Sequence, residues 1–191
     1  GLKPVIVDPD PDTFNISVEA LRKAITPRTR AVVPVHLFGQ CADMENILSI
    51  ASGYGLYVVE DAAQATGAEY FFSNGNKRKA GTIGKIGTTS FFPSKNLGCY
   101  GDGGAIYTND EDIAVKIRSI ANHGMKVRYK YSDIGINSRL DTLQAAILRV
   151  KLKYLDRFNN ARRGVADYYD KAFSGCPDIQ IPVRKGFSSH I

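Results

Sequence analysis

Lys95 and Asp61 are the two residues whose types and settings are best suited to chemistry. Lys95 follows two phenylalanines and a proline after a strand-like run, and Asp61 lies just past an apolar run that begins at Leu56. Apolar surroundings disfavour the ammonium form of a lysine, which leaves an amine able to attack an aldehyde. A carboxylate at the end of an apolar strand needs a partner, and a protonated pyridine nitrogen is suitable. The pair therefore favours pyridoxal phosphate chemistry, which takes a Schiff-base lysine and a carboxylate from the protein.

Each residue also has an ordinary structural interpretation. A lysine after a strand is most often a surface lysine, and Asp61 could equally be a helix cap or half of a buried salt bridge. Two glycine-rich stretches, residues 81–85 and 101–104, resemble nucleotide-binding loops. Neither has the full pattern, so both are better interpreted as turns.

The composition is that of a globular protein. Of 191 residues, 43% are hydrophobic and 23% are charged, enough for one substantial core. Three widely spaced cysteines favour a reducing, cytoplasmic setting over a disulfide framework, and three scattered histidines predict no metal site. No apolar run reaches the roughly 18 residues that would span a membrane. The chain begins without methionine, and we expect it to be an internal fragment.

Basic residues are concentrated in the second half. Between Lys116 and Lys171 there are 13 Lys or Arg and 5 Asp, a local excess of 8. Such a face can attract nucleic acid or a phosphorylated small molecule, or it can be a solvated helix surface. Because no recognised nucleic-acid-binding motif accompanies the charge, a non-enzymatic nucleic-acid-binding module is only a remote alternative.

The first half alternates short apolar runs with helical patterns, which predicts a parallel sheet with crossover helices. The expected strands are residues 5–7, 31–35, 56–59, 88–92 and 105–107. The expected helices are residues 17–24, capped by Ser17, 43–54, capped by Asp43, and 110–121. Residues 72–87 are expected to form a loop. Asp61 and Lys95 then fall just beyond strand ends, where open α/β sheets bind ligands.

Apolar residues recur at steps of three and four from Ser138 to about residue 173. This spacing predicts one long amphipathic helix, or two in sequence broken near Asn159 and Asn160. Ser138 and Asp141 resemble a capping box at its start.

Five stretches, taken together and in order, resemble one known family. They are residues 34–39 (PVHLFG), 59–64 (VEDAAQ), 90–97 (SFFPSKNL), 101–105 (GDGGA) and 135–141 (GINSRLD). The chain resembles the DegT/DnrJ/EryC1/StrS family, the pyridoxal-phosphate-dependent aminotransferases of nucleotide sugars. The resemblance implies an α/β fold of the aspartate-aminotransferase type, with a mostly parallel sheet, helices on both faces, and assembly as a homodimer.

The resemblance also implies roles for residues around the cofactor, pyridoxal 5'-phosphate. Lys95 would form the Schiff base and then move a proton between cofactor and substrate carbon. Asp61 would pair with the pyridine nitrogen, and Gln64 would hydrogen-bond near the phenolic oxygen. Ser90 would contact the phosphate.

Two more residues are implied to act at the substrate or across a subunit interface. Asn137 would reach the phosphate of the neighbouring subunit's cofactor, so each active site would need two chains. Arg139 would bind the substrate, because a fixed guanidinium suits a carboxylate.

The implied reaction transfers an amino group from glutamate to a keto group on a nucleotide-linked sugar. Some relatives catalyse dehydration with a histidine in place of the lysine, so Lys95 favours transamination. Residues 90–106 are most similar to the subgroup acting on UDP-2-acetamido-2-deoxy-3-keto-glucuronate, on a route to surface polysaccharide or lipopolysaccharide. An amino-acid aminotransferase is the alternative that keeps the cofactor.

The family pattern also divides the chain. Residues 1–137 would be part of the large cofactor-binding domain, residues 138–173 the helical link, and residues 174–191 the start of a truncated small domain. The phosphate loop and the aromatic residue that stacks on the pyridine ring are expected before Gly1. Members of the family commonly have a histidine near the position of Tyr131, so this chain departs from the family pattern there. We therefore expect this fragment alone to bind the cofactor poorly and to be inactive.

Overall fold

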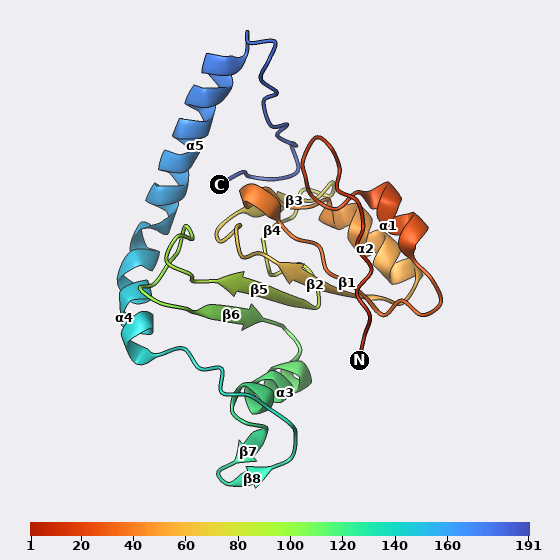
Figure 1. Cartoon of the computed structure of the whole chain (residues 1–191), viewed down its shortest axis with the longest axis vertical. Coiled ribbons are helices and arrows are strands. Elements are labelled where there is room, and N and C mark those ends of the chain that lie inside the picture. The colour runs from red at the N-terminus through yellow and green to blue at the C-terminus, as the bar shows by residue number, and fades with distance from the viewer.

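The computed structural model describes residues 1–191 and is built around a four-stranded sheet (Figure 1). The strand order is β1-β2-β5-β6, and the strands are β1 (Ala31–Val32), β2 (Tyr57–Asp61), β5 (Ile86–Ser90) and β6 (Gly104–Tyr107). The first three are parallel, and β6 is antiparallel to β5. Parallel strands place their carboxyl ends at one edge, so β2 and β5 deliver the residues that follow them to the same place.

Five α-helices and two short hairpins surround the sheet. The helices are α1 (Val18–Ala24), α2 (Met44–Gly53), α3 (Glu111–Ala121), α4 (Thr142–Lys151) and α5 (Leu155–Phe173). The hairpins are β3 (Glu69–Phe71) with β4 (Lys77–Lys79) and β7 (Met125–Val127) with β8 (Lys130–Tyr131). Two 3-10 turns, η1 (Leu37–Gly39) and η2 (Leu152–Tyr154), complete the elements. No helix is both long and apolar enough to cross a membrane.

The starts of the first three helices are confirmed, because each begins after a side chain that caps it. Ser17, Asp43 and Asp110 each accept a hydrogen bond from the backbone N–H three residues on, at 3.2, 3.4 and 3.0 Å. Such a bond satisfies one of the N–H groups that a helix start leaves without a partner.

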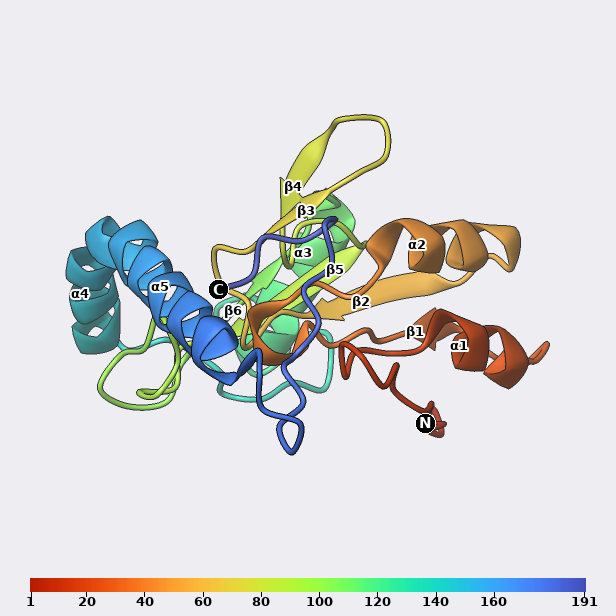
Figure 2. The same ribbon diagram turned by 90° about the horizontal axis from the view of Figure 1, so that it is seen from above.

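Two apolar clusters hold the elements together. The larger one fills the space between α1, α2 and the first two strands, with Met44 and Ile47 completely buried. The smaller one, Phe91, Leu97, Cys99, Leu148 and Leu155, fixes the loop after β5 against α4 and α5. The views in Figures 1 and 2 agree that α4 and α5 lie on one side of the sheet and α1 and α2 on the other.

The structure corrects several predicted strands. Residues 5–7 form no strand, because no neighbouring strand pairs with them and Ile6 is 90% exposed. The predicted loop 72–87 contains β4, whose charged Lys77–Lys79 side chains are all exposed, and the start of β5. The strand predicted at 31–35 ends at Val32, and Val35 makes only an isolated bridge with Asp61.

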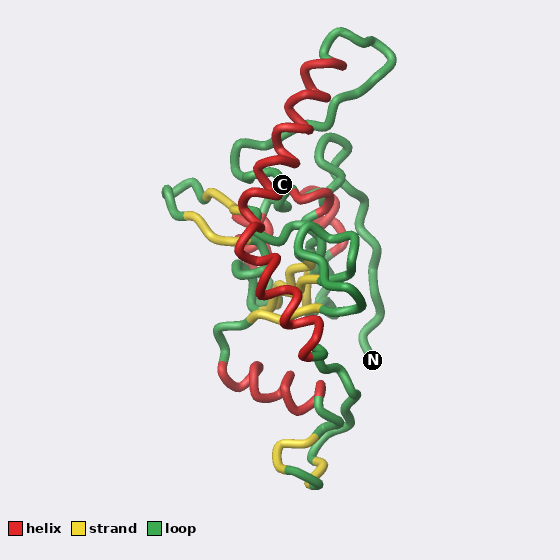
Figure 3. Tube along the Cα trace, turned by 90° about the vertical axis from the view of Figure 1, so that its left-hand side faces the viewer, coloured by secondary structure: helices red, strands yellow, loops and turns green.

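The helical region was predicted in outline but its details are corrected. Of the two alternatives, a break near Asn159 and Asn160 is wrong, because both residues lie inside α5. A single long helix is closer, since α4 and α5 are interrupted by η2 alone. Asp141 precedes α4 but its side chain makes no capping bond, and the backbone N–H of Ser138 donates to Ala121, so the capping box does not form. Figure 3 shows α4 and α5 as a nearly continuous rod along the molecule.

Residues 174–191 leave α5 and return across the molecule (Figure 1). The backbone N–H of Phe71 donates to Phe187 at 2.7 Å, and that of Ser189 donates to Glu69 at 2.8 Å. The N–H of Ile191 donates to the Gly39 carbonyl at 3.3 Å. This segment therefore adds to the edge of β3 and reaches η1. The domain boundaries after residues 137 and 173 stay predictions.

Candidate active site

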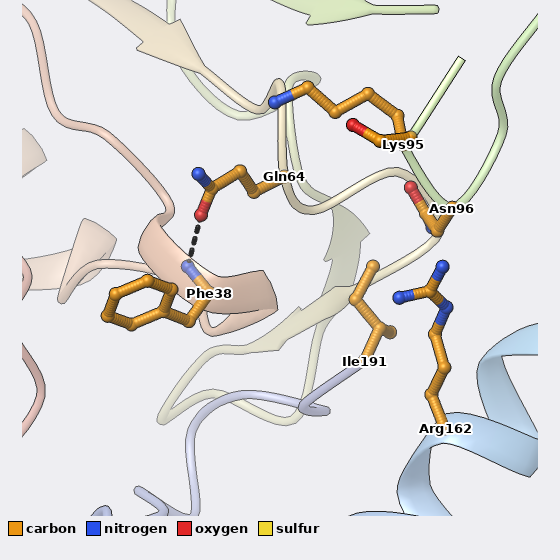
Figure 4. A pocket seen from close by; sticks show the side chains of 7 residues that line it. Phe38, Gln64, Lys95, Asn96, Arg162 and Ile191 are labelled. Carbon is orange, nitrogen blue, oxygen red and sulfur yellow. Dashed lines mark hydrogen bonds between the residues drawn. The ribbon is translucent and has the colours of Figure 1, made fainter. Parts of the chain in front are cut away.

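An open cavity of about 370 Å³ lies where the loop after β5 faces η1, α5 and the end of the chain (Figure 4). Its lining residues are Phe38, Gln64, Ser94, Lys95, Asn96, Arg162 and Ile191. Two of the predicted site residues, Lys95 and Gln64, are thus brought together. The lining contains two basic side chains, Lys95 and Arg162, and no acidic side chain.

Lys95 lies in a turn whose backbone N–H donates to the Phe92 carbonyl at 2.9 Å. Its side chain is half-buried and has no hydrogen bond or ion pair within the chain. Phe91 is buried in the smaller cluster, but Phe92 and Pro93 are exposed, so the apolar surroundings expected from them are only partly formed. The amine nevertheless lies at the cavity without a partner from the chain.

Gln64 has a fixed orientation. Its Oε1 atom accepts a hydrogen bond from the backbone N–H of Phe38 at 2.7 Å (Figure 4). Phe38 can offer this N–H because it adopts a left-handed conformation, with φ 55°, inside η1. The Nε2 group of Gln64 is therefore the side that remains available as a donor to a ligand.

Asp61 ends β2 and is anchored through its backbone. Its N–H donates to Pro34, and its carbonyl accepts from His36, both at 2.9 Å. Its Oδ1 accepts from the N–H of Ala63 at 3.0 Å, and the carboxylate forms no ion pair. No helix follows it, so neither structural interpretation of Asp61, a helix cap or a buried salt bridge, is observed.

A buried pair beside Asp61 escaped the sequence analysis. Glu60 and His36 are both fully buried, and His36 Nε2 lies 2.9 Å from Glu60 Oε2. The His36 Nδ1 accepts from the N–H of Ala42 at 3.1 Å, so Nε2 carries the proton and donates to the carboxylate. Three backbone N–H groups of the loop before β5 also donate to Glu60, at 2.9, 2.6 and 2.6 Å: Gly81, Ile83 and Gly84.

The electrostatics of Glu60 follow from these donors. Burial alone would raise the pKa of its carboxyl, but the hydrogen bonds from His36, Gly84 and Gly81 outweigh that effect and lower the pKa below its usual value. The Glu60 carboxylate thus connects the end of β2 both to His36 and to the loop before β5. A signal for this pair was present, because an acid inside an apolar run needs a partner.

Asn96 and Asn159 were also missed. Asn96 Nδ2 donates to the carbonyl of Thr66 at 2.6 Å and to Asn159 Oδ1 at 3.0 Å, while Asn159 Nδ2 donates to Thr66 at 3.2 Å. These bonds join the loop after β2, the Lys95 loop and α5. The Asn96 Oδ1 is buried and lacks a partner. Asn159 is 1% exposed, and a polar residue at a buried position on a helix indicates a hydrogen bond and not a helix break.

The other predicted residues lie outside the cavity lining. Ser90, the last residue of β5, accepts from the N–H of Phe92 at 3.2 Å. Asn137 forms a bridge with Asn122 at the end of α3, and its Oδ1 accepts from Arg139 Nε at 3.0 Å. Both Asn137 and Arg139 are exposed. Their roles toward a cofactor, a substrate or a second subunit stay predictions.

The sheet, with Asp61 at the end of β2 and the unpaired Lys95 in the loop after β5, belongs to an α/β fold, and solved aminotransferase structures confirm this fold class. A structure of a DegT DnrJ EryC1 StrS aminotransferase from Brucella abortus has a TM-score of 0.91 and 40% identity, covering 100% of this chain and 51% of that one. The structure of NtdA from Bacillus subtilis with bound cofactor PMP has a TM-score of 0.81 and 37% identity, covering 94% and 41%.

The model of the DegT/DnrJ/EryC1/StrS aminotransferase family matches residues 1–190, and the chain belongs to this family. A UDP-2-acetamido-2-deoxy-3-oxo-D-glucuronate aminotransferase from Pseudomonas aeruginosa is 50% identical over 185 residues, which are 95% of this chain and 50% of that enzyme. The chain thus spans about half the length of the relatives it matches.

Proposed function

We propose that this protein is a pyridoxal-phosphate-dependent aminotransferase that moves an amino group from glutamate to a keto group on a nucleotide-linked sugar. The observation that carries the proposal is the unpaired Lys95 amine at the cavity it shares with the oriented amide of Gln64. Membership of an aminotransferase family supports it. When bound, pyridoxal phosphate supplies an electron sink that allows an amino group and a keto group to be exchanged.

The residues present fit this cofactor. Lys95 offers an amine without a competing partner, and Asp61 offers a carboxylate without an ion pair, held at the end of β2. Asp61 would hold a proton on the pyridine nitrogen. Gln64, whose Oε1 is already engaged, would donate from Nε2 to an oxygen of the ring. Ser90 would contact the phosphate, and Lys95 would move the proton at the substrate carbon.

The proposed substrate is a UDP-linked 3-keto-hexuronate, used in surface polysaccharide or amino-sugar biosynthesis. The 50% identical relative, whose name states a 3-oxo-glucuronate substrate, supports this choice. We further propose a homodimer in which Asn137 reaches the cofactor phosphate of the other subunit and Arg139 binds the substrate. The exposed position of both residues, away from the cavity lining, supports a role between chains.

Covalent attachment of the cofactor to Lys95 tests the reaction class. The full-length protein supplied with pyridoxal phosphate should develop a visible imine absorbance, and borohydride should then add the cofactor mass to the peptide that contains Lys95. Lys95→Ala should abolish both signals. Lys85→Ala, which changes a lysine paired with Asp110, should keep them. Attachment at another lysine, or at none, would refute the proposal.

The substrate class needs a separate measurement. Transfer of ¹⁵N from labelled glutamate to a UDP-3-keto-hexuronate should be faster than transfer to simple 2-keto acids. Preference for 2-keto acids would instead identify an amino-acid aminotransferase.

A further inference from the structure

Arg162 is a cationic side chain at the cavity that no partner within the chain neutralises. It extends from α5 toward the space beside Asn96 and Ile191 (Figure 4). It forms no hydrogen bond and no ion pair. The adjacent Arg163 is engaged, because its Nε donates to the carbonyl of His190 at 2.6 Å and its NH1 to Asn160. Of two consecutive arginines, one is structural and the other is free.

Nearby carboxylates do not compensate the charge of Arg162. Asp167 and Asp170, further along α5, both pair with Arg184, at 2.6 and 2.5 Å. The cavity lining contains no Asp or Glu side chain. Arg162 therefore presents a positive charge to a cavity whose lining has no acidic side chain, which favours a negatively charged ligand.

The position of Arg162 is fixed by the face of the helix on which it lies. Leu155 and Asn159 precede it by seven and three residues and are both buried against the Lys95 loop. Residues at this spacing share one helix face. Because the Asn159 amide is bonded to Asn96 at 3.0 Å and to Thr66 at 3.2 Å, α5 cannot rotate without breaking these bonds. The backbone of residue 162 is thus held next to the cavity, on the helix face from which the Arg162 side chain reaches it.

We propose that Arg162 binds an anionic oxygen group of the substrate, a carboxylate or a phosphate. A guanidinium presents five donors in a planar fork that matches both groups. The inference rests on the proposed function, in which Lys95 carries the cofactor and the substrate must lie next to it. Three sources share this chemistry: the carboxylate of the amino donor, the diphosphate of the nucleotide, and the carboxylate of the hexuronate.

Equilibrium binding of three probes to the full-length protein distinguishes these sources. Glutarate carries the donor's carboxylates, UDP-glucose carries the diphosphate, and UDP-glucuronate adds a sugar carboxylate. Calorimetry on Arg162→Gln should show at least one probe weakened about tenfold or more, the loss expected for a charge-assisted contact. Weaker binding of glutarate would show that Arg162 binds the carboxylate of the amino donor. Weaker binding of both nucleotides would show that it binds the diphosphate, and weaker binding of UDP-glucuronate alone would show that it binds the sugar carboxylate.

The matched control is Arg157→Gln. It removes the same charge from the same helix at a residue outside the cavity lining, whose guanidinium lies over Tyr154, 5.3 Å from the ring centre. It should bind all three probes like the unmodified protein, and Arg162→Lys should recover part of the lost affinity. The inference is overturned if the unmodified protein binds no probe, if Arg162→Gln binds all three normally, or if Arg157→Gln is equally weakened. Cofactor attachment at Lys95, measured separately, decides the proposed function independently of these results.

Discussion

At the scale of single residues, the buried charge of Glu60 and the unpaired basic side chains at the cavity have different roles. Glu60 has four hydrogen-bond donors on its two oxygens and is closed to solvent, whereas Lys95 and Arg162 have no partners and line the cavity. A buried charge with all its partners supplied is rigid, because losing any partner costs free energy. An unpaired charge at a cavity is available to a ligand. The buried carboxylate of Glu60, next to Asp61, therefore has a structural role, whereas Lys95 and Arg162 are available to a ligand.

Glu60→Gln should destabilise the protein. The glutamine Nε2 would face N–H donors where the carboxylate accepted, which leaves buried donors without acceptors. Each such group costs about 1–3 kcal/mol, so urea unfolding at pH 7 should show a loss of at least that size. Glu19→Gln, at an exposed pair with Lys23, should unfold like the unmodified protein. Equal stability of the two variants would contradict the role given to Glu60.

The loss of stability in Glu60→Gln should also depend on pH. The pKa of Glu60 is lowered in the folded state, so the carboxylate contributes stability that is present above its ordinary pKa of 4.5 and is lost as the pH falls through the folded value. The stability difference between the unmodified protein and Glu60→Gln should therefore be full at pH 7 and shrink below about pH 4.5. Urea unfolding across this range measures it, and a difference that grows on acidification would contradict the sign.

At the scale of elements, the sequence predicted the features that depend only on neighbouring residues, such as helix starts. The starts of α1, α2 and α3 follow from Ser17, Asp43 and Asp110, because a cap acts within one turn. The predicted strand at residues 5–7 failed since a strand needs a partner that an apolar run cannot guarantee. The charged strand β4 was missed because its side chains all face solvent and its pairing with β3 leaves no apolar signature.

The candidate site was predicted in part for the same reason. Lys95 and Gln64, which line the cavity, lie in short motifs next to strand ends, which the sequence shows directly. Arg162 and Asn159 come from a helix more than sixty residues further along, and the bond between Asn159 and Asn96 has no local signature. Their contribution depends on how α5 packs, which is a property of the folded chain.

Asn159→Ala should loosen α5 from the Lys95 loop. The change removes two hydrogen bonds at a buried position, and about 1–3 kcal/mol of the free energy of unfolding should be lost. Amide hydrogen exchange in residues 94–98 should also become faster. Asn160→Ala is the matched control, because Asn160 is exposed and its side chain bonds only to Arg163. Equal losses of stability in the two variants would show that the hydrogen bonds of Asn159 do not hold α5 against the Lys95 loop.

At the scale of the whole molecule, the proposed homodimer makes a complementation prediction. Lys95→Ala and Asn137→Ala proteins should each be inactive or nearly so. In a mixed dimer one site combines the intact Lys95 of one chain with the intact Asn137 of the other. Random mixing makes about half of the dimers mixed, so refolding the two together should restore about a quarter of the normal activity. No recovery would show that Asn137 does not act across subunits.

The return of residues 174–191 across the molecule has a consequence for the order of folding. Ser188 Oγ accepts a hydrogen bond from the N–H of Cys41, 147 residues away in the sequence, at 2.9 Å. The N–H of Ile191, which lines the cavity, donates to the carbonyl of Gly39. Closing so long a loop costs entropy before any contact repays it, and contacts at such separations form slowly. We therefore expect the cavity to be among the last parts of this chain to form, after the sheet and α2 provide the surface on which residues 188–191 pack.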